Sequence, residues 1–291
     1  MIRISNCWED YELLETGNQE KTERWGNIIL RRPDPQCIWP YTGKQSMVIH
    51  GLYTRSDTGG GSWEWYKNIP GRWQIAYRDL KFWIEPTGFK HTGLFPEQAV
   101  NWDFLIDKIK GEISNTKKPV SVLNLFAYTG GATVACAYAG ASVCHVDASK
   151  GMVTRAKENA QLSGLANAKI RYIVDDVVKF VKREINRNNK YDVIIMDPPS
   201  YGRGPKGEMW QIEDSLYSLV GLCSSVLSDD PLAFLVNSYA SDISMTAVKN
   251  VLDLTVGKKY GGSTECYELG LQQSGNNLVM PCGYTARWEK K

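Results

Sequence analysis

The cysteines of this 291-residue chain show no clustering, which excludes the two kinds of site that cysteines most often build. Seven cysteines are spread from Cys7 to Cys282, and no two of them form a Cys-x-x-Cys pair. Zinc sites and disulfide frameworks both depend on clustered or regularly paired cysteines. We therefore expect reduced, buried thiols in a protein from a reducing compartment.

Long apolar runs and a signal-peptide pattern are also missing. The chain begins Met-Ile-Arg-Ile-Ser-Asn-Cys-Trp-Glu-Asp, with acidic residues where a signal peptide needs an apolar core. No stretch reaches the length of apolar sequence that spans a bilayer. These absences predict a soluble, cytoplasmic protein without a membrane partner.

A strong excess of one charge is absent as well. The chain has 34 Lys and Arg against 32 Asp and Glu, a formal net charge of +2. Such a balance does not by itself indicate a nucleic-acid-binding protein, although one basic face around a cleft would be hidden in the sum. With 43% apolar residues, the composition is that of an ordinary globular protein.

Tryptophan is concentrated in the first ninety residues, which hold seven of the ten. Strand-like runs at 27–32 and 73–86 are separated by Gly, Asp and Pro, so residues 1–88 are predicted to form a small β-rich unit. The tryptophans there are suited either to stacking on nucleotide bases or to building the core of a small β unit. We favour the core.

From Val120 onward, strand and helix patterns alternate. Apolar strand runs at 120–128, 141–147, 169–175, 191–197 and 231–239 are separated by helical patterns, and 264–288 resembles a closing hairpin. This order predicts an α/β fold over residues 89–291, a doubly wound, mostly parallel seven-stranded Rossmann-like sheet with helices on both faces.

Ligands of such sheets bind outside the carboxyl ends of the strands. The first of these strands runs into Asn124-Leu-Phe-Ala-Tyr-Thr-Gly-Gly131, in which the glycines allow the backbone to pass close to a ligand. The segment is not the Gly-x-Gly-x-x-Gly motif that offers a helix N-terminus to a pyrophosphate. It therefore favours a ligand without phosphate, and argues against a nicotinamide dehydrogenase.

Two aspartates follow the next two strands. Asp147 is placed to accept both hydroxyls of a ribose, and the alternative is that it caps the following helix; Ser149 already offers that cap, which favours ribose. Asp176 could accept from an adenine amino group while Val177 packs on the ring. Its alternative role is that of an acidic residue stabilised by a helix N-terminus.

Asp197-Pro198-Pro199 ends the fourth strand and carries the predicted chemistry. The Asp197 carboxylate and the Pro198 carbonyl can accept hydrogen bonds from an exocyclic amine and so make its nitrogen nucleophilic, and the prolines keep the turn stiff. Tyr201, one residue after Ser200, is the candidate to stack on a base. A simple strand terminator is the alternative.

The stretch from Trp83 to Leu254 resembles the family of large-subunit ribosomal RNA methyltransferases, which includes cytosine-C5 and guanine-N7 enzymes built on the class I S-adenosylmethionine-dependent domain. The matching segments are FKHTGLFPEQAVNW at 89–102, VLNLFAYTGGATVACAYAGA at 122–141, VDASKGMVTRAKENAQLSGL at 146–165 and DPPSYGRG at 197–204.

The resemblance implies S-adenosylmethionine as the cofactor and RNA, most of all ribosomal RNA, as the partner. It also implies that Phe126, Thr129 and Gly130 line the methionine part of the cofactor, that Asp147 holds the ribose and Asp176 the adenine, and that Phe95 and Gln98 close over the cofactor; Asn124, Ala148 and Val177 complete the predicted cofactor-binding residues. Asp197, Pro198 and Tyr201 are the predicted catalytic residues, and Pro199, Ser200, Arg203 and Lys206 the predicted substrate-binding ones. The family commonly has an arginine after the glutamine of the first segment, whereas this chain has Ala99, which leaves the anchor of the cofactor carboxylate unidentified.

The absence of a cysteine limits which atom of the base can accept the methyl group. Methylation at cytosine C5 needs a cysteine that adds to C6, and relatives of that specificity carry it after the fifth strand. This chain has Asn237-Ser-Tyr-Ala-Ser-Asp242 there, and Cys223 lies within an apolar helix pattern that predicts a core residue. Nitrogen or oxygen is therefore the expected acceptor.

Residues 202–207 are predicted to form a basic loop beside this site. Arg203 and Lys206 in it suit either a phosphate backbone or a solvated surface. The chain is thus predicted to be a methyltransferase for a base nitrogen in RNA. The alternatives are a methyltransferase acting on a small molecule or a protein, and a noncatalytic module that binds the cofactor or RNA.

Overall fold

The computed structural model describes residues 1–42, 47–56, 60–88, 90–203, 209–240 and 242–290, and these divide into two compact units. Unit 1 comprises Met1–Arg3, Asn101–Glu268 and Gly283–Lys291, and unit 2 comprises Ile4–Val100 and Leu269–Cys282. Among the described residues, no helix combines the length and the apolar character needed to cross a bilayer.

The division differs from the boundary expected after residue 88. Unit 2 continues to Val100 and also takes up the connection between the last two long strands. Within it, the backbone N–H and the hydroxyl of Thr16 donate to Oε1 of Gln273 at 3.0 and 2.6 Å. A boundary drawn from composition could not include this segment, because it lies 257 residues further along the chain from Thr16.

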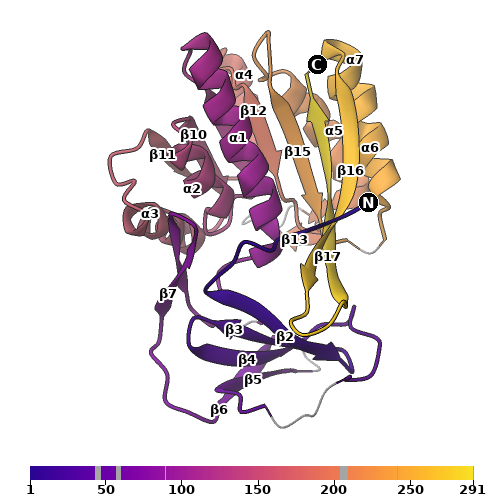
Figure 1. The fold of residues 1–291 in the computed structure, drawn as a ribbon. Helices are drawn as coiled ribbons and strands as arrows, with labels where there is room; N and C mark the ends of the chain where they lie inside the picture. The colour runs from indigo at the N-terminus through magenta and orange to yellow at the C-terminus, as the bar shows by residue number, and fades with distance from the viewer. Residues whose placement is uncertain (43–46, 57–59, 89, 204–208, 241, 291) are drawn as a thin grey trace. The chain divides into compact units, whose positions relative to one another are not determined.

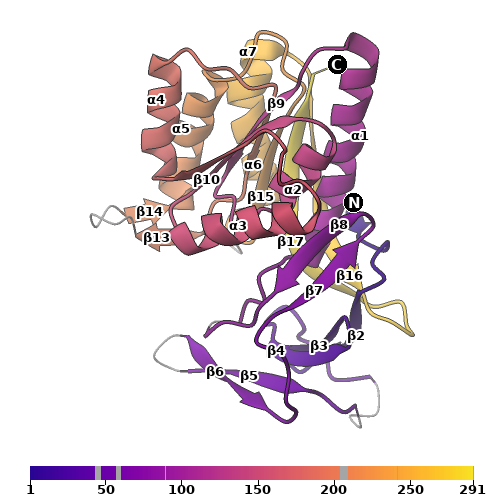
Figure 2. The ribbon, with the colours of Figure 1, turned by 90° about the vertical axis from the view of Figure 1, so that its left-hand side faces the viewer.

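Unit 1 is built on one eight-stranded sheet with the strand order β1-β16-β17-β15-β12-β9-β10-β11 (Figures 1 and 2). Its strands are β1 (Ile2–Ile4), β9 (Ser121–Leu125), β10 (Ser142–Asp147), β11 (Ile170–Val174), β12 (Val193–Met196), β15 (Ala233–Ser238), β16 (Ser263–Gln272) and β17 (Val279–Glu289). Strands β11, β10, β9, β12 and β15 are parallel neighbours, and β17 runs antiparallel to β15. The predicted doubly wound α/β sheet is confirmed, with β1 as an eighth strand that the sequence did not indicate.

Helices cover both faces of this sheet. They are α1 (Ala99–Thr116), α2 (Gly131–Tyr138), α3 (Lys150–Leu162), α4 (Val177–Asn186), α5 (Ile212–Ser224), α6 (Met245–Leu252), the π-helical turn η2 (Asp253–Gly257) and α7 (Lys258–Tyr260). The 18-residue helix α1 lies in a segment for which we predicted no helix.

Two apolar cores flank the sheet. Residues of α1 and α2, such as Leu105 and Cys136, pack with Val193 on one face. Residues of α4, α5 and α6 pack with the neighbouring strand residue, Ile194, on the other. Successive residues of a strand point to opposite faces, so a strand covered on both sides must be apolar throughout. This explains the continuous apolar runs of the sequence.

Unit 2 contains a five-stranded sheet, a two-stranded sheet and a short 3-10 helix. The strands are β2 (Tyr11–Gly17), β3 (Glu20–Trp25), β4 (Ile28–Pro33), β5 (Gly51–Arg55) and β6 (Gly61–Trp65) in that order, then β7 (Trp73–Tyr77) paired with β8 (Leu80–Ile84), and η1 spans Pro96–Gln98. Trp25 is fully buried and its carbonyl accepts from the Trp73 indole N–H at 2.9 Å. The expected structural role of tryptophan is confirmed for Trp25.

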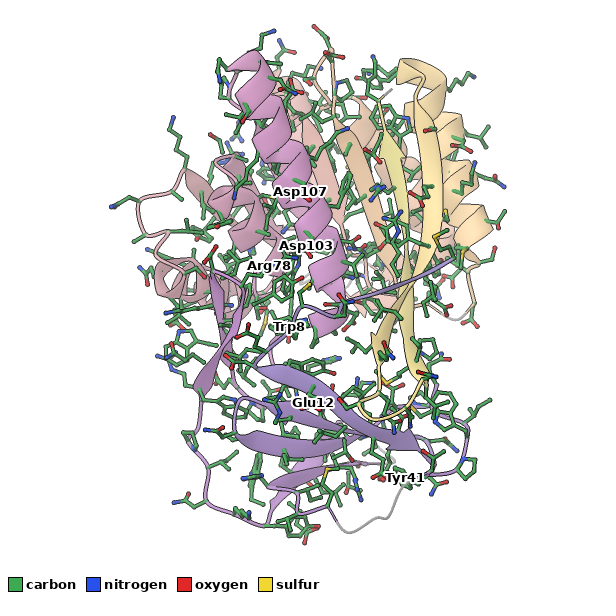
Figure 3. All side chains as sticks on the ribbon, viewed as in Figure 1. Trp8, Glu12, Tyr41, Arg78, Asp103 and Asp107 are labelled. Atoms are coloured by element: carbon green, nitrogen blue, oxygen red, sulfur yellow. The ribbon has the colours of Figure 1, made fainter. Side chains whose placement is uncertain are left out.

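A hollow of about 450 Å³ in unit 2 has Trp8 and Glu12 among the residues that line it. Trp8, labelled in Figure 3, donates its indole N–H to the Pro96 carbonyl at 3.0 Å. Glu12, also labelled, accepts from Arg24 Nε at 3.0 Å. These contacts give Trp8 and Glu12 a structural role in unit 2.

Candidate functional site

The ends of three neighbouring parallel strands lie level with one another in unit 1. Leu125 is paired with Val146 of β10 on one side and with Met196 of β12 on the other. The next residues, Asp147 and Asp197, therefore leave the sheet at the same height on either side of the β9 end. Two strand spacings separate them, about 10 Å. The strand order reverses here, which is where doubly wound sheets bind ligands.

The loop after β9 has an unusual backbone. Phe126, Tyr128 and Gly130 have φ angles of +53°, +48° and +82°. Left-handed conformations cost free energy in residues other than glycine and concentrate at ligand sites. The loop is fixed by hydrogen bonds from Ala127 N–H to the Val146 carbonyl at 3.1 Å and from Asn159 Nδ2 to the Thr129 carbonyl at 2.9 Å.

Gly130 and Gly131 allow helices to approach this loop closely. A Cβ on Gly130 would lie 2.8 Å from the Ala156 Cβ of α3, and one on Gly131 would lie 2.6 Å from the Trp102 ring of α1. The sequence suggested that these glycines make room for a ligand. The structure shows that they also make room for α3 and α1, and their role toward a ligand stays a prediction.

Asp147 accepts hydrogen bonds with both carboxylate oxygens. The N–H of Ser149 donates to Oδ1 and the N–H of Tyr128 to Oδ2, each at 2.8 Å. Burial raises the pKa of Asp147, and these two hydrogen bonds lower it in part. The cap of α3 comes from the Ser149 hydroxyl, as the sequence predicted. Since a carboxylate has about four lone-pair positions, Asp147 retains acceptor capacity.

Asp176 takes up the structural role that the sequence left open for it. Its side chain caps α4 by accepting from the Lys179 N–H at 2.9 Å. Val177 is 4% exposed and packs in the apolar core, while the neighbouring Asp175 pairs with Arg183. A role of Asp176 or Val177 toward adenine stays a prediction.

Asn124 lies within the core beneath the loop. Its Nδ2 donates to the Thr133 hydroxyl, and that hydroxyl lies 2.9 Å from Nδ1 of His145. Burial lowers the pKa of His145 to about 4, so the ring is neutral at physiological pH. His145 is fully buried, and its Nε2 has no hydrogen-bond partner in the described part of the chain. Ala148, in contrast, is exposed.

The Asp-Pro-Pro turn is held by a residue that the sequence analysis missed. Asp197 donates its N–H to the Leu125 carbonyl at 3.4 Å, and Pro198 is buried while Pro199 is exposed. The indole N–H of Trp210 donates to the Pro199 carbonyl at 2.6 Å. Its ring also lies 5.3 Å from that of Phe126, so Trp210 connects the turn with the loop after β9. The only sequence signal was a tryptophan outside the Trp-rich first ninety residues.

Part of the expected basic loop is a strand. Tyr201–Arg203 form β13, which pairs antiparallel with β14, Met209–Gln211, with Gly202 opposite Trp210. Backbone pairing across this short hairpin corrects the expectation of a loop from Gly202 onward. Tyr201 is 49% exposed. Lys206 lies outside the described residues, and of Arg203 only the backbone is described.

Ser200 follows the turn and connects it with α5. Its carbonyl accepts from the Ile212 N–H at the start of that helix at 3.1 Å. Phe95 and Gln98, at η1, belong to unit 2, and Gln98 is 8% exposed. Their closure over a cofactor stays a prediction.

The end of β15 carries a buried polar network and no thiol. Oδ1 of Asn237 accepts from Asn101 at 3.1 Å and from Thr285 at 2.8 Å, and Asn101 also accepts from Tyr267 at 2.6 Å. Cys223 is fully buried in α5 and burial raises its pKa, which confirms it as a core residue. Among the described residues, no group of His, Cys, Asp and Glu is arranged to hold a metal.

The doubly wound sheet, the strained loop after its first parallel strand and the acidic residue ending the second define a nucleoside-binding α/β enzyme fold. Residues 32–219 match the sequence profile of the family described as S-adenosylmethionine-dependent methyltransferase. The chain belongs to this family, and its cofactor is S-adenosylmethionine.

Other methyltransferases are similar to this chain in structure or in sequence. The crystal structure of the SAM-dependent methyltransferase from Agrobacterium tumefaciens is 33% identical, with a TM-score of 0.93, over 100% of this chain and 94% of that one. The ribosomal RNA large subunit methyltransferases K/L of Shewanella frigidimarina and of Shewanella sp. strain MR-4 are 35% and 29% identical over 60% and 62% of this chain. The chain spans 24% and 26% of the length of these two relatives.

Proposed function

We propose that this methyltransferase transfers a methyl group to a base nitrogen in RNA, with ribosomal RNA as the favoured substrate. The observation that carries the proposal is the level alignment of Asp147 and Asp197 on either side of the strained loop after β9. One aspartate is suited to hold the nucleoside of a cofactor, and the other to meet the acceptor.

The residues present fit S-adenosylmethionine, which supplies an electrophilic methyl group when it is bound. Asp147 would accept hydrogen bonds from the ribose hydroxyls, because its oxygens are fixed by backbone N–H groups and not by a cation. Phe126, Thr129 and Gly130 would line the methionine part. Hydrogen bonds from the Ala127 N–H and from Asn159 Nδ2 hold the loop in its left-handed form, which preorganises the site.

Asp197 and Pro198 would position the acceptor. A carboxylate and a carbonyl that accept hydrogen bonds from an exocyclic amine draw its lone pair out of conjugation with the ring, and groups fixed in advance do so without reorganisation. Trp210 fixes the following carbonyl of Pro199. Tyr201, with half of its surface exposed, would stack on a base, and Ser200 and Arg203 of the same segment are proposed to contact the substrate.

RNA as the substrate class is supported by the two relatives, whose names give ribosomal RNA as their substrate. The absence of cysteine from 237–242 and after Pro199 favours nitrogen over cytosine C5. A ribosomal RNA substrate also agrees with the cytoplasmic location that we expected.

The proposal is tested by incubating the protein with S-adenosylmethionine carrying a labelled methyl group and undermethylated total RNA, followed by mass spectrometry of the nucleosides. We expect label in one nitrogen-methylated nucleoside. Label at a carbon would overturn the choice of acceptor atom, and label in protein or in a small molecule would overturn RNA as the substrate. Binding of S-adenosylhomocysteine without any transfer would leave only the noncatalytic module.

A further inference from the structure

Unit 2 contains a hollow of about 570 Å³ whose lining combines exposed aromatic rings with a cation. It lies around the end of β6 and the segment that follows this strand. The residues that line it are Trp65, Tyr66, Lys67, Asn68, Ile69, Pro70, Gly71 and Pro86. The methyl-transfer site does not use them, and we call this surface the Trp65 face.

The aromatic rings of the Trp65 face are exposed but fixed in position. Trp65 is 41% exposed and Tyr66 49%, unlike the fully buried Trp25. The ring of Trp65 stacks on that of Trp63, with centroids 4.9 Å apart and planes 9° apart. A Cβ on Gly51 would lie 2.4 Å from the Trp65 ring, so glycine is required for this ring position.

Trp63 is itself anchored, so the stack has a rigid base. Its indole N–H donates to the Thr87 carbonyl at 2.8 Å, and its ring packs edge-on against Tyr53 at 5.4 Å. Two rings in a fixed stack, one of them exposed, offer a stacking platform with little loss of side-chain entropy on binding.

The polar groups of the Trp65 face favour an anion. The described residues that line the hollow include no carboxylate. Within the described part of the chain, the side chains of Lys67 and Asn68 form no ion pair or hydrogen bond. Lys67 lies close enough to lower the pKa of His50, after the larger effect of burial. The neighbouring Glu64 is engaged by the Tyr66 hydroxyl at 2.9 Å.

We propose that the Trp65 face binds unpaired nucleotides of RNA, with a base stacked on Trp65, a phosphate at Lys67 and a base edge at the Asn68 amide. Stacking on an exposed aromatic ring beside a basic residue is the usual means of holding single-stranded RNA without strong sequence preference. The core of a site for a protein partner is depleted of charged residues, whereas the lining of this hollow includes Lys67 and Asn68. The inference rests on the proposed function, because it names how the RNA substrate is held.

The test measures fluorescence anisotropy of a labelled single-stranded RNA titrated with the full chain, without cofactor. Trp65→Ala should weaken binding by roughly 5- to 150-fold, the effect of losing one stacked base, and Trp65→Phe should weaken it less. Lys67→Glu should weaken binding and reduce the slope of log affinity against log salt by about 1. Matched controls are Tyr217→Ala, an exposed aromatic of α5 at 55% exposure, and Lys258→Glu on α7.

Each variant is first shown to bind S-adenosylhomocysteine with the affinity of the original protein, so that misfolding is separated from loss of contact. Equal RNA affinity of Trp65→Ala and the original protein, or no RNA binding by the original, overturns the inference. So does a dimer of the original protein that Trp65→Ala dissociates, because a second copy would then occupy the face. These outcomes are distinct from failure of the proposed function, which appears as absence of methylated nucleoside.

Discussion

Two carboxylates, one in each unit, show how different the demands on a buried charge can be. Glu23 of unit 2 is fully buried and accepts from the Tyr11 hydroxyl at 2.8 Å and from Arg32 Nε at 2.8 Å. Burial raises the pKa of Glu23, but the charges of Arg32 and then of Lys21 lower it by more than burial raises it. The net shift of this pKa is therefore downward. Asp147 of unit 1 forms no ion pair within the described residues, and burial gives its pKa a net upward shift.

The comparison teaches that burial of a carboxylate does not mark a functional site by itself. Glu23 accepts three hydrogen bonds, one from Tyr11 and two from Arg32, and these hold strands β2, β3 and β4 together. Asp147 is fixed by backbone N–H groups, which orient a carboxylate without neutralising it. A buried acid that is oriented but not neutralised can still act on a ligand.

The largest effect is expected from Glu23→Gln. Removing one member of a buried ion pair leaves Arg32 without its counter-ion and should lower the free energy of unfolding by about 3–5 kcal/mol. The measurement is urea denaturation followed by circular dichroism. A change of less than about 1 kcal/mol, the size expected for an exposed pair, would contradict the structural role of Glu23. The solvent-exposed pair of Asp230 and Lys290, broken by Asp230→Asn, is the control.

Asp197→Ala tests the other end of the comparison, where a carboxylate serves chemistry. Loss of one preorganised polar group at a reacting centre should lower kcat by about 100- to 1000-fold. Cofactor binding should persist, because Asp197 lies across the β9 end from Asp147. Single-turnover methyl transfer and calorimetry with S-adenosylhomocysteine separate the two effects. Asp197→Asn keeps one acceptor oxygen and should lose less activity; an active alanine variant would refute the assignment.

Asp147→Ala should weaken binding of S-adenosylhomocysteine by about 1.5–3 kcal/mol, the range for hydrogen bonds to a charged group. Calorimetry gives this value directly. Asp176→Ala is the matched control, because Asp176 caps α4 and its loss should cost about 1 kcal/mol of stability. If Asp176→Ala weakened cofactor binding as much as Asp147→Ala does and left the stability unchanged, a role of Asp176 toward adenine would be favoured over its role as a helix cap.

The sequence predicted the parts of this site that follow from the order of strands. Asp147 and Asp197 could be located because each ends an apolar strand, and parallel strands bring their ends to one edge. The role of Trp210 could not be predicted. Its hydrogen bond to the Pro199 carbonyl depends on the pairing of β13 with β14, and the two residues are 11 positions apart in a stretch without a clear strand pattern.

In the rest of the fold, too, the sequence failed to predict features that lack a local pattern. Helix α1 was missed because its sequence, AVNWDFLIDKIKGEISNT, has no capping residue at its start. Strand β1 was missed because three residues carry too little pattern to identify a strand. The packing of Gly130 against α3 was missed because the helix atom that a Cβ would meet, in Ala156, is 26 residues away in the chain.

Trp210→Phe would sharpen the comparison by removing one neutral hydrogen bond at the site while keeping the ring beside Phe126. The net value of such a bond is about 1 kcal/mol, so kcat should fall about five-fold with little change in the KM for the cofactor. Trp73→Phe removes an equivalent indole bond, to the Trp25 carbonyl in unit 2, and should lower stability but not kcat. Equal kcat values for Trp210→Phe and the original protein would exclude Trp210 as a positioning residue.

The smallest effect, and the most direct contrast of the two carboxylates, is expected on mild acidification. The raised pKa of Asp147 means that it takes up a proton at a higher pH than an ordinary aspartate, at about 3.9, would. Ribose hydroxyls donate to the ionised form, so affinity for S-adenosylhomocysteine should fall as pH decreases toward and through that raised pKa. Asp147→Asn should abolish this dependence, and a dependence that survives in this variant would assign it to another group.

The pKa of Glu23 is shifted in the opposite direction from that of Asp147. Its lowered pKa means that it stays ionised in the folded protein at pH values where the unfolded chain already binds a proton, near 4.3. Its contribution to stability is therefore complete above that pH and is lost only as the pH falls through the lower folded value. Cofactor affinity should therefore decline at a pH at which the fold is still intact. Burial makes Asp147 of the site easier to protonate, whereas Arg32 and Lys21 make Glu23 of the scaffold harder to protonate. Unfolding that coincides with the loss of affinity would show that the two carboxylates do not differ in this way.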